Sequence, residues 1–168
     1  MAELLSPVYP PRDQLELLNE ELHKRAELQS DELEGLDRKA STVLGATGVV
    51  LALVVNNARQ FHTVSGEARN VFFGSLVILA VGLVVGLLTL FPRDIKVVPN
   101  PRHLLEQYYA ASTEETLAQL AVTRLRAFEE NRGFSLRKGW GVRAQIVLLA
   151  SGGTILVAAY LLKEFAHA

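Results

Sequence analysis

The chain contains no cysteine, which excludes disulfide bonds, thiol nucleophiles and thiolate metal sites. It also lacks the GxxxxGK(S/T) phosphate loop, the GxSxG nucleophile turn and the HExxH zinc pattern. The histidines are scattered along the chain, at His23, His62, His103 and His167, and we expect no metal site among them. The sequence therefore predicts a protein that is not an enzyme and that holds no cofactor and no metal.

Charge is also missing from three long windows, residues 40–58, 70–92 and 144–162, each of which contains a dense apolar run. A helix needs about 20 mostly apolar residues to cross a hydrocarbon core about 30 Å thick. We therefore predict membrane spans over 40–58, 70–92 and 143–163, and lipid as a partner. No ionisable side chain lies in the middle of a span, which argues against a transporter with an intramembrane relay. No short basic region followed by an apolar core opens the chain, so we expect no signal peptide.

Outside the spans, the sequence predicts amphipathic helices. Asp13 and Glu16 form a predicted capping box, and no proline interrupts the chain from there to Asn57. One helix is therefore expected over 13–39, continuing into the first span. Its apolar stripe, at steps of three and four, comprises Leu15, Leu18, Leu22, Ala26, Gln29, Leu33, Leu36 and Ala40.

A second helical segment is expected over 100–138, between spans two and three. Its predicted boundaries are a start at Asn100-Pro101, a capping box of Ser112 with Glu115, an end at Gly133 and a new cap at Ser135. The expected fold is thus an all-α integral membrane protein, one domain over 1–168, with three transmembrane helices. The N-terminal helix and the 100–138 segment are expected to form a cytoplasmic helical bundle.

The distribution of positive charge predicts the orientation. Residues 1–39 hold five Lys and Arg and residues 93–143 hold nine, so these two segments carry fourteen of the seventeen. The positive-inside rule then places the N terminus and the 93–143 segment in the cytoplasm. Trp140, among basic residues before the third span, is a predicted interfacial anchor. The net charge of −1 gives no general attraction to nucleic acid.

Two glycines in the second span, Gly82 and Gly86, have the GxxxG spacing that lets helix backbones approach closely. Two interpretations stay open, because such a pair is as typical of packing within one chain as of a subunit interface. On the second interpretation these glycines form the interface of a homo-oligomer.

Charged and polar residues gather at two matching membrane edges, and they are Asp37, Arg38, Lys39, Asn131 and Lys138. The simpler interpretation is that basic side chains extend along the membrane edge toward water, with Asp37 paired locally. The alternative is a ligand site in which Lys39, Lys138 and nearby arginines bind a phosphate. Asn131 and Asp37 would then contact a base or a ribose.

The run ELHKRAELQSDELEGLDRKASTVLGATGVVLALV resembles the opening of the Pycsar membrane effector family. In that family a cytoplasmic helix ends in an Asp-x-Lys-Ala signature that leads directly into the first span. Here the signature is Asp37, Arg38, Lys39 and Ala40.

A second run, TEETLAQLAVTRLRAFEENRGFSLRKGWGVRAQIVL, is similar to the family's second block. Its Glu130-Asn131 pair is followed by Lys138 before the last span. The resemblance covers roughly residues 14–165. Related two-span effectors of bacterial nucleotide signalling share parts of this plan.

The resemblance implies an anti-phage effector in the bacterial inner membrane. A partner pyrimidine nucleotide cyclase would make cyclic CMP or cyclic UMP on infection, and the effector would sense it. The membrane would then lose integrity, and the infected cell would stop growing or die. No cyclic-nucleotide-binding β-barrel is recognisable in the sequence, so a ligand is expected between helices or subunits. The alternative is a non-catalytic membrane scaffold that recruits a protein through its acidic cytoplasmic helix.

Overall fold

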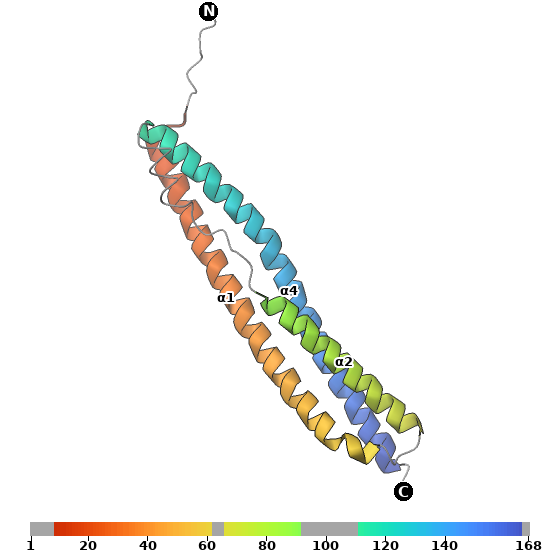
Figure 1. Ribbon diagram of the computed structural model, residues 1–168. Coiled ribbons are helices and arrows are strands. Elements are labelled where there is room, and N and C mark those ends of the chain that lie inside the picture. Colours follow the sequence, from red (N-terminus) through yellow and green to blue (C-terminus); the bar gives the residue numbers. More distant parts are fainter. Residues whose placement is uncertain (1–8, 62–65, 92–110, 166–168) are drawn as a thin grey trace, which may run out of the picture. The chain divides into compact units, whose positions relative to one another are not determined.

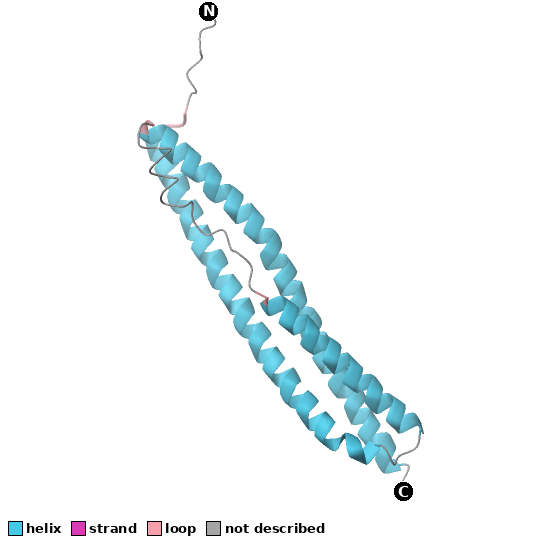
Figure 2. Cartoon of the chain, viewed as in Figure 1, coloured by secondary structure: helices cyan, strands magenta, loops and turns pink. Residues whose placement is uncertain are grey.

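The computed structural model describes residues 9–61, 66–91 and 111–165. Within these ranges the chain is helical and contains no strand (Figure 2). The predicted all-α fold is therefore confirmed. The elements, in chain order, are α1 (Arg12–Asn57), the 3-10 helix η1 (Ala58–Phe61), α2 (Gly66–Leu90) and α4 (Thr113–Phe165) (Figure 1).

Helix α1 begins at Arg12, and its start differs from the predicted capping box. The backbone amides of Gln14 and Leu15 both donate to the Pro11 carbonyl, at 3.0 and 3.2 Å. Pro11 therefore occupies the N-cap position, and Asp13 lies in the first turn. An acidic residue in the first turn still interacts favourably with the positive end of the helix dipole.

Helix α4 is a single helix of 53 residues, from Thr113 to Phe165. The predicted cap is confirmed in part, because the Glu115 amide donates to the Ser112 hydroxyl at 3.2 Å. The predicted end at Gly133 and the predicted cap at Ser135 are wrong. A terminating glycine adopts a left-handed conformation, and no described glycine has a positive φ. The helix predicted to start at Asn100-Pro101 lies outside the described residues.

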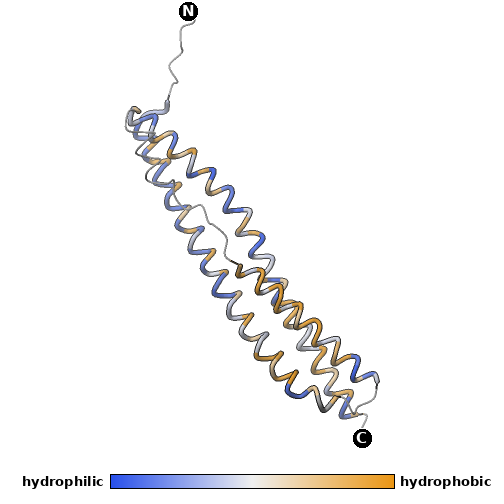
Figure 3. Tube along the Cα trace, viewed as in Figure 1, coloured by the Kyte–Doolittle hydropathy of each residue, from blue (hydrophilic) through white to orange (hydrophobic). Residues whose placement is uncertain are grey.

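Three helices, α1, α2 and α4, are each long and apolar enough to cross a membrane, as predicted. Colouring by hydropathy shows apolar residues along α2 and along the later parts of α1 and α4 (Figure 3). The earlier parts of α1 and α4 are predominantly polar. Helix α2 begins at Gly66, before the predicted start of the second span at residue 70.

The chain divides into two compact units. Unit 1 comprises Met1–Leu33 and Arg93–Ser135, and unit 2 comprises Glu34–Pro92 and Leu136–Ala168. Unit 1 thus holds the polar parts of α1 and α4, whereas unit 2 holds their apolar parts together with η1 and α2.

Unit 2 has an aromatic core. The rings of Phe61 and Phe72 are stacked with their centroids 4.1 Å apart, and Tyr160 meets Phe61 edge-on at 5.0 Å. Val54 and Leu79 are buried in the same cluster. Residues from α1, η1, α2 and α4 therefore close one part of unit 2 with tightly packed rings.

Candidate functional site

Polar residues recur at every seventh position along α4, at Arg124, Asn131, Lys138 and Gln145. Seven residues are close to two helical turns, so such positions lie on one side of a helix. Arg124 and Asn131 belong to unit 1, whereas Lys138 and Gln145 belong to unit 2. A buried polar group is costly unless it finds a hydrogen-bond partner, so the partner of each residue is informative.

In unit 1 the polar residues connect α1 to α4. The Asn19 amide nitrogen donates to the Leu117 carbonyl at 2.9 Å and to its own helix at Leu15. Arg124 in turn donates to the Asn19 carbonyl at 2.9 Å. Gln29, which is buried, donates to the Phe128 carbonyl at 3.3 Å. These side-chain to backbone bonds fix the register of the two helices.

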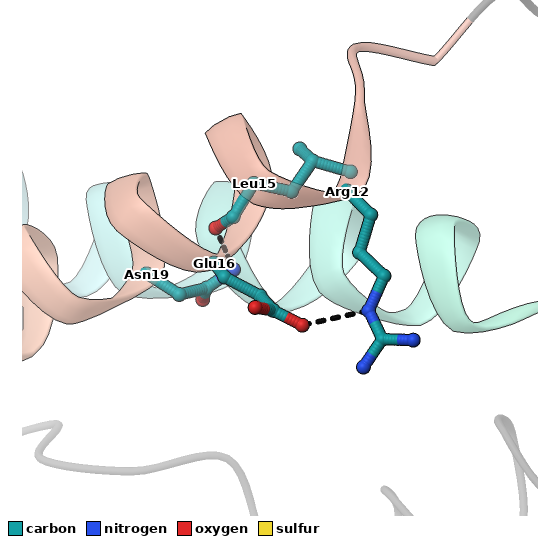
Figure 4. A network of polar contacts seen from close by, with 4 residues as sticks. All are labelled: Arg12, Leu15, Glu16 and Asn19. Atoms are coloured by element: carbon teal, nitrogen blue, oxygen red, sulfur yellow. Dashed lines mark hydrogen bonds and ion pairs between the residues drawn. The ribbon is translucent and has the colours of Figure 1, made fainter.

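Asn19 was not predicted as a buried position, whereas Leu18 was. The structure reverses them, with Asn19 6% exposed and Leu18 47% exposed. Figure 4 shows Asn19 beside the first turn of α1, where Arg12 Nε donates to a Glu16 carboxylate oxygen at 2.7 Å. That hydrogen bond, with the charge of the carboxylate, raises the pKa of the Arg12 guanidinium. Glu16 thus pairs with Arg12.

In unit 2, Lys138 forms an ion pair with Asp37, with Nζ and Oδ1 2.5 Å apart. The Lys138 side chain is only 6% exposed, whereas that of Asp37 is 45% exposed. The pair connects the α1 and α4 segments of unit 2, at the position where each segment precedes its apolar run. Two of the predicted site residues are therefore brought together, and they come from the two sequence blocks singled out above.

The other predicted site residues are Arg38, Lys39 and Asn131. Arg38 and Lys39 follow Asp37 on α1, and both are exposed. Asn131 is half-buried and belongs to unit 1, so its role as a ligand-binding residue stays a prediction. The described residues contain no group of His, Asp and Glu that could hold a metal ion.

Gly82 and Gly86 pack within the chain. Both are buried, and a Cβ at Gly82 would lie 3.3 Å from Leu148 Cβ on α4. A Cβ at Gly86 would overlap the Gln145 amide and would lie 2.9 Å from Leu44 Cδ1. Of the two interpretations of the GxxxG pair, the structure shows packing within one chain. A role of these glycines in a subunit interface stays a prediction.

Gln145 was not predicted as a site residue. It is fully buried, and neither its amide nitrogen nor its carbonyl oxygen has a hydrogen-bond partner among the described residues. The signal that identifies it in the sequence is its spacing, seven residues after Lys138 on the same helix. A buried amide of this kind is rare in folded proteins and requires an explanation.

These features define a small helical membrane protein with three spans and a polar cluster where two span-forming segments begin. The Pycsar effector protein domain matches residues 21–162, and the chain therefore belongs to the Pycsar effector family. It is an effector of an anti-phage defence system. The matched range includes Asp37, Lys138 and Gln145. No curated protein and no solved structure matches the chain.

Proposed function

We propose that this effector senses a cyclic pyrimidine mononucleotide, cyclic CMP or cyclic UMP, and then impairs the bacterial inner membrane. The observation that carries the proposal is the Asp37–Lys138 ion pair, which joins the family's two sequence blocks in unit 2. Its two residues offer a cation for a phosphate and a carboxylate for a donor group. The infected cell would then stop growing or die.

The chemistry of the pair supports a phosphate-containing ligand. The Lys138 ammonium is buried beside the half-exposed carboxylate of Asp37, and a cyclic phosphate is another anion that can bind it. Asp37, once displaced, can accept a hydrogen bond from a ribose hydroxyl or an exocyclic amino group. Arg38 and Lys39, both exposed on the same helix, supply further positive charge for an incoming anion.

The proposal needs no catalysis. Binding an anion at Lys138 exchanges one ion pair for another, and no covalent bond is made or broken. The ligand would bind one of two packing states of the helices more tightly and so raise the population of that state, as in other ligand-driven switches. The nucleotide cyclase contributes through its diffusible product.

The direct test is to titrate the purified full-length protein with cyclic CMP, cyclic UMP and cyclic purine nucleotides. We expect a cyclic pyrimidine nucleotide to bind, and Lys39→Ala or Lys138→Ala to weaken binding about ten- to a hundredfold, because one charge-assisted hydrogen bond is lost. Lys24→Ala, an exposed lysine in unit 1, is the matched control.

The same variants are then compared in infected cells. Membrane depolarisation should be lost in Lys39→Ala and Lys138→Ala while the amount of membrane-inserted protein stays normal. Full activity in both variants would contradict the assignment. Loss of activity together with loss of the inserted protein would leave both lysines only a structural role.

A second function, a membrane scaffold that recruits a protein partner, is favoured by one observation. Leu17 and Leu28 on the acidic part of α1 are 69% and 61% exposed. Leu17 and Leu28 could supply the apolar contacts of such a partner, because large apolar side chains lose contact with water when a protein covers them. If no cyclic nucleotide binds, and Leu17→Ser with Leu28→Ser abolishes defence, the scaffold replaces the sensor as the function of this chain.

A further inference from the structure

Unit 2 contains one buried polar side chain whose hydrogen-bonding groups are unmatched. Gln145 is 0% exposed, and both of its polar atoms lack a partner among the described residues. Its amide fills the space that a side chain at Gly86 would occupy, and Leu44 lies close to the same point. In this packing, which we call the closed state, the polar amide of Gln145 lies between the Leu44 side chain and the backbone of Gly86.

Other buried polar side chains of unit 2 differ in this respect. The Thr47 hydroxyl donates to the Val43 carbonyl at 2.8 Å, and the Ser75 hydroxyl donates to the Phe72 carbonyl at 2.7 Å. Both bonds lie within a single helix, so they persist if the helices move apart. Gln145 gains hydrogen bonds only if water or another polar group reaches it.

We propose that Gln145 is the residue at which the three spans admit water and hydrated ions. In the closed packing its amide has no partner, and separation of the helices lets water bind it, so Gln145 favours the open, permeable state. Its position in the predicted third span, seven residues beyond Lys138, supports this role, because polar groups inside spans mark the paths of water and ions.

The aromatic cluster of unit 2 supplies the complementary part of this arrangement. Phe61, Phe72 and Tyr160 pack ring against ring, and Phe61 and Phe72 are almost fully buried. Tightly packed rings exclude water, so the aromatic cluster closes the spans to water in the closed state. The unpaired amide of Gln145 destabilises the same state at a different position. Opening requires the helices to separate at both places.

This inference rests on the proposed function, because a path for ions has a role only if the effector impairs the membrane. To the proposed function it adds one residue, Gln145, which determines how readily the path for ions opens. It also assigns different effects to two residues on one helix, since Lys138 governs ligand binding and Gln145 governs opening.

The test compares Gln145→Leu and Gln145→Asn with Thr47→Val in the full-length protein. Leucine has a similar size without the amide, asparagine keeps the amide, and Thr47→Val removes a buried hydroxyl that is already bonded within its helix. The readouts are the unfolding midpoint of purified protein without ligand, and the rate of dye leakage from vesicles of bacterial inner-membrane lipids after cyclic CMP or cyclic UMP is added.

We expect Gln145→Leu to raise the unfolding midpoint by about 2–6 °C, because the unpaired amide is gone. We expect it to slow leakage about tenfold or more while nucleotide binding is unchanged. Gln145→Asn should keep most of the leakage, and Thr47→Val should neither raise the midpoint nor slow the leakage.

Each other outcome decides against one of the two proposals. If the parent protein causes no leakage with any nucleotide, the proposed function fails, and the inference fails with it. If the parent causes leakage and Gln145→Leu causes the same leakage, the inference alone is overturned. Equal loss in Gln145→Leu and Gln145→Asn would also overturn it, because the amide would then matter only for packing.

Discussion

Lys138 is the one charged residue that is buried within the described parts of the chain. A buried ammonium is tolerated only when it is paired and hydrogen-bonded, because removing a charge from water costs several kcal/mol. Asp37 provides that pairing at 2.5 Å. The ion pair therefore contributes less as a net stabiliser than as a fixed point, because its loss would remove the Asp37 carboxylate from a buried ammonium.

Replacing Asp37 by asparagine should therefore destabilise the protein. We expect Asp37→Asn to lower the free energy of unfolding by about 1–3 kcal/mol, below the 3–5 kcal/mol typical of a fully buried pair, since Asp37 is half exposed. Lys138→Met should restore much of that loss in the double variant. A double-mutant cycle by chemical denaturation in detergent measures this coupling, and a coupling energy near zero would show that the pair has no structural role.

The sequence could not show which of two neighbouring residues, Leu18 or Asn19, lies on the buried face of α1. Both Leu18 and Asn19 fit a spacing of three and four from Leu15, and hydrophobicity favoured Leu18. The structure buries Asn19 because its amide meets the Leu117 carbonyl of the other helix. That partner is nearly a hundred positions away, so the local pattern could not reveal it. Asp37 and Lys138 were predictable as candidates because each lies in a charged cluster directly before an apolar span.

At the scale of the element, glycines have different roles in α2. Gly86 is in tight contact with Gln145 and Leu44, whereas nothing lies within 4 Å of a Cβ at Gly74. We expect Gly86→Leu to lower the free energy of unfolding by about 1–3 kcal/mol through overpacking. Gly74→Leu, in the same helix, should be close to neutral, and thermal unfolding of the two purified variants compares them.

The same variants address the subunit interface. If Gly86→Leu also weakens a crosslinked oligomer in membranes, the glycines contribute to assembly as well as to packing within the chain. An unchanged oligomer in a folded Gly86→Leu variant, or a parent protein that is only monomeric, would contradict an interface at these glycines.

Helix α4 shows why helix ends were harder to predict than helices. In the sequence Gly133 is typical of a helix end and Ser135 of a cap, but the helix continues through both. Glycine in a helix costs about 1 kcal/mol relative to alanine. The tertiary packing of the helical segments before and after Gly133 outweighs this cost. The cap at Ser112 was predictable because its partner, Glu115, is local.

Gly133 therefore offers a simple gain in stability. It is exposed within a helix, and nothing lies within 4 Å of the position of its Cβ. We expect Gly133→Ala to raise the free energy of unfolding by about 0.5–1 kcal/mol, because alanine loses less backbone entropy. Denaturant unfolding with the parent as reference measures this change. A destabilised Gly133→Ala variant would mean that a bend at this glycine is needed in the native state.

For the molecule as a whole, α1 and α4 are each shared between the two units. Unit 1 holds them together through polar side chains such as Asn19 and Arg124, and unit 2 does so through apolar packing and the Asp37–Lys138 ion pair. Because α1 and α4 run without a break through both units, a change of helix packing in one unit can affect the other unit through the same two helices.

The orientation in the membrane is a prediction from the distribution of Lys and Arg along the whole chain. Fourteen of the seventeen Lys and Arg lie in residues 1–39 and 93–143. Because positive charge is retained on the cytoplasmic side, both segments should face the cytoplasm. Trp140, which is 67% exposed, has the Arg143 guanidinium 5.6 Å from its ring, as suits a membrane interface.

Single cysteines test this orientation cleanly, since the chain has none of its own. The exposed positions His23, Glu67 and Thr113 represent the N-terminal segment, the start of α2 and the start of α4. A membrane-impermeant maleimide applied to spheroplasts should label Glu67→Cys, whereas His23→Cys and Thr113→Cys should react only after lysis. Labelling of the latter two in intact spheroplasts would place the Asp37–Lys138 pair on the outer side. A nucleotide made in the cytoplasm could not reach it there, so the sensing proposal and the orientation fail together under that result.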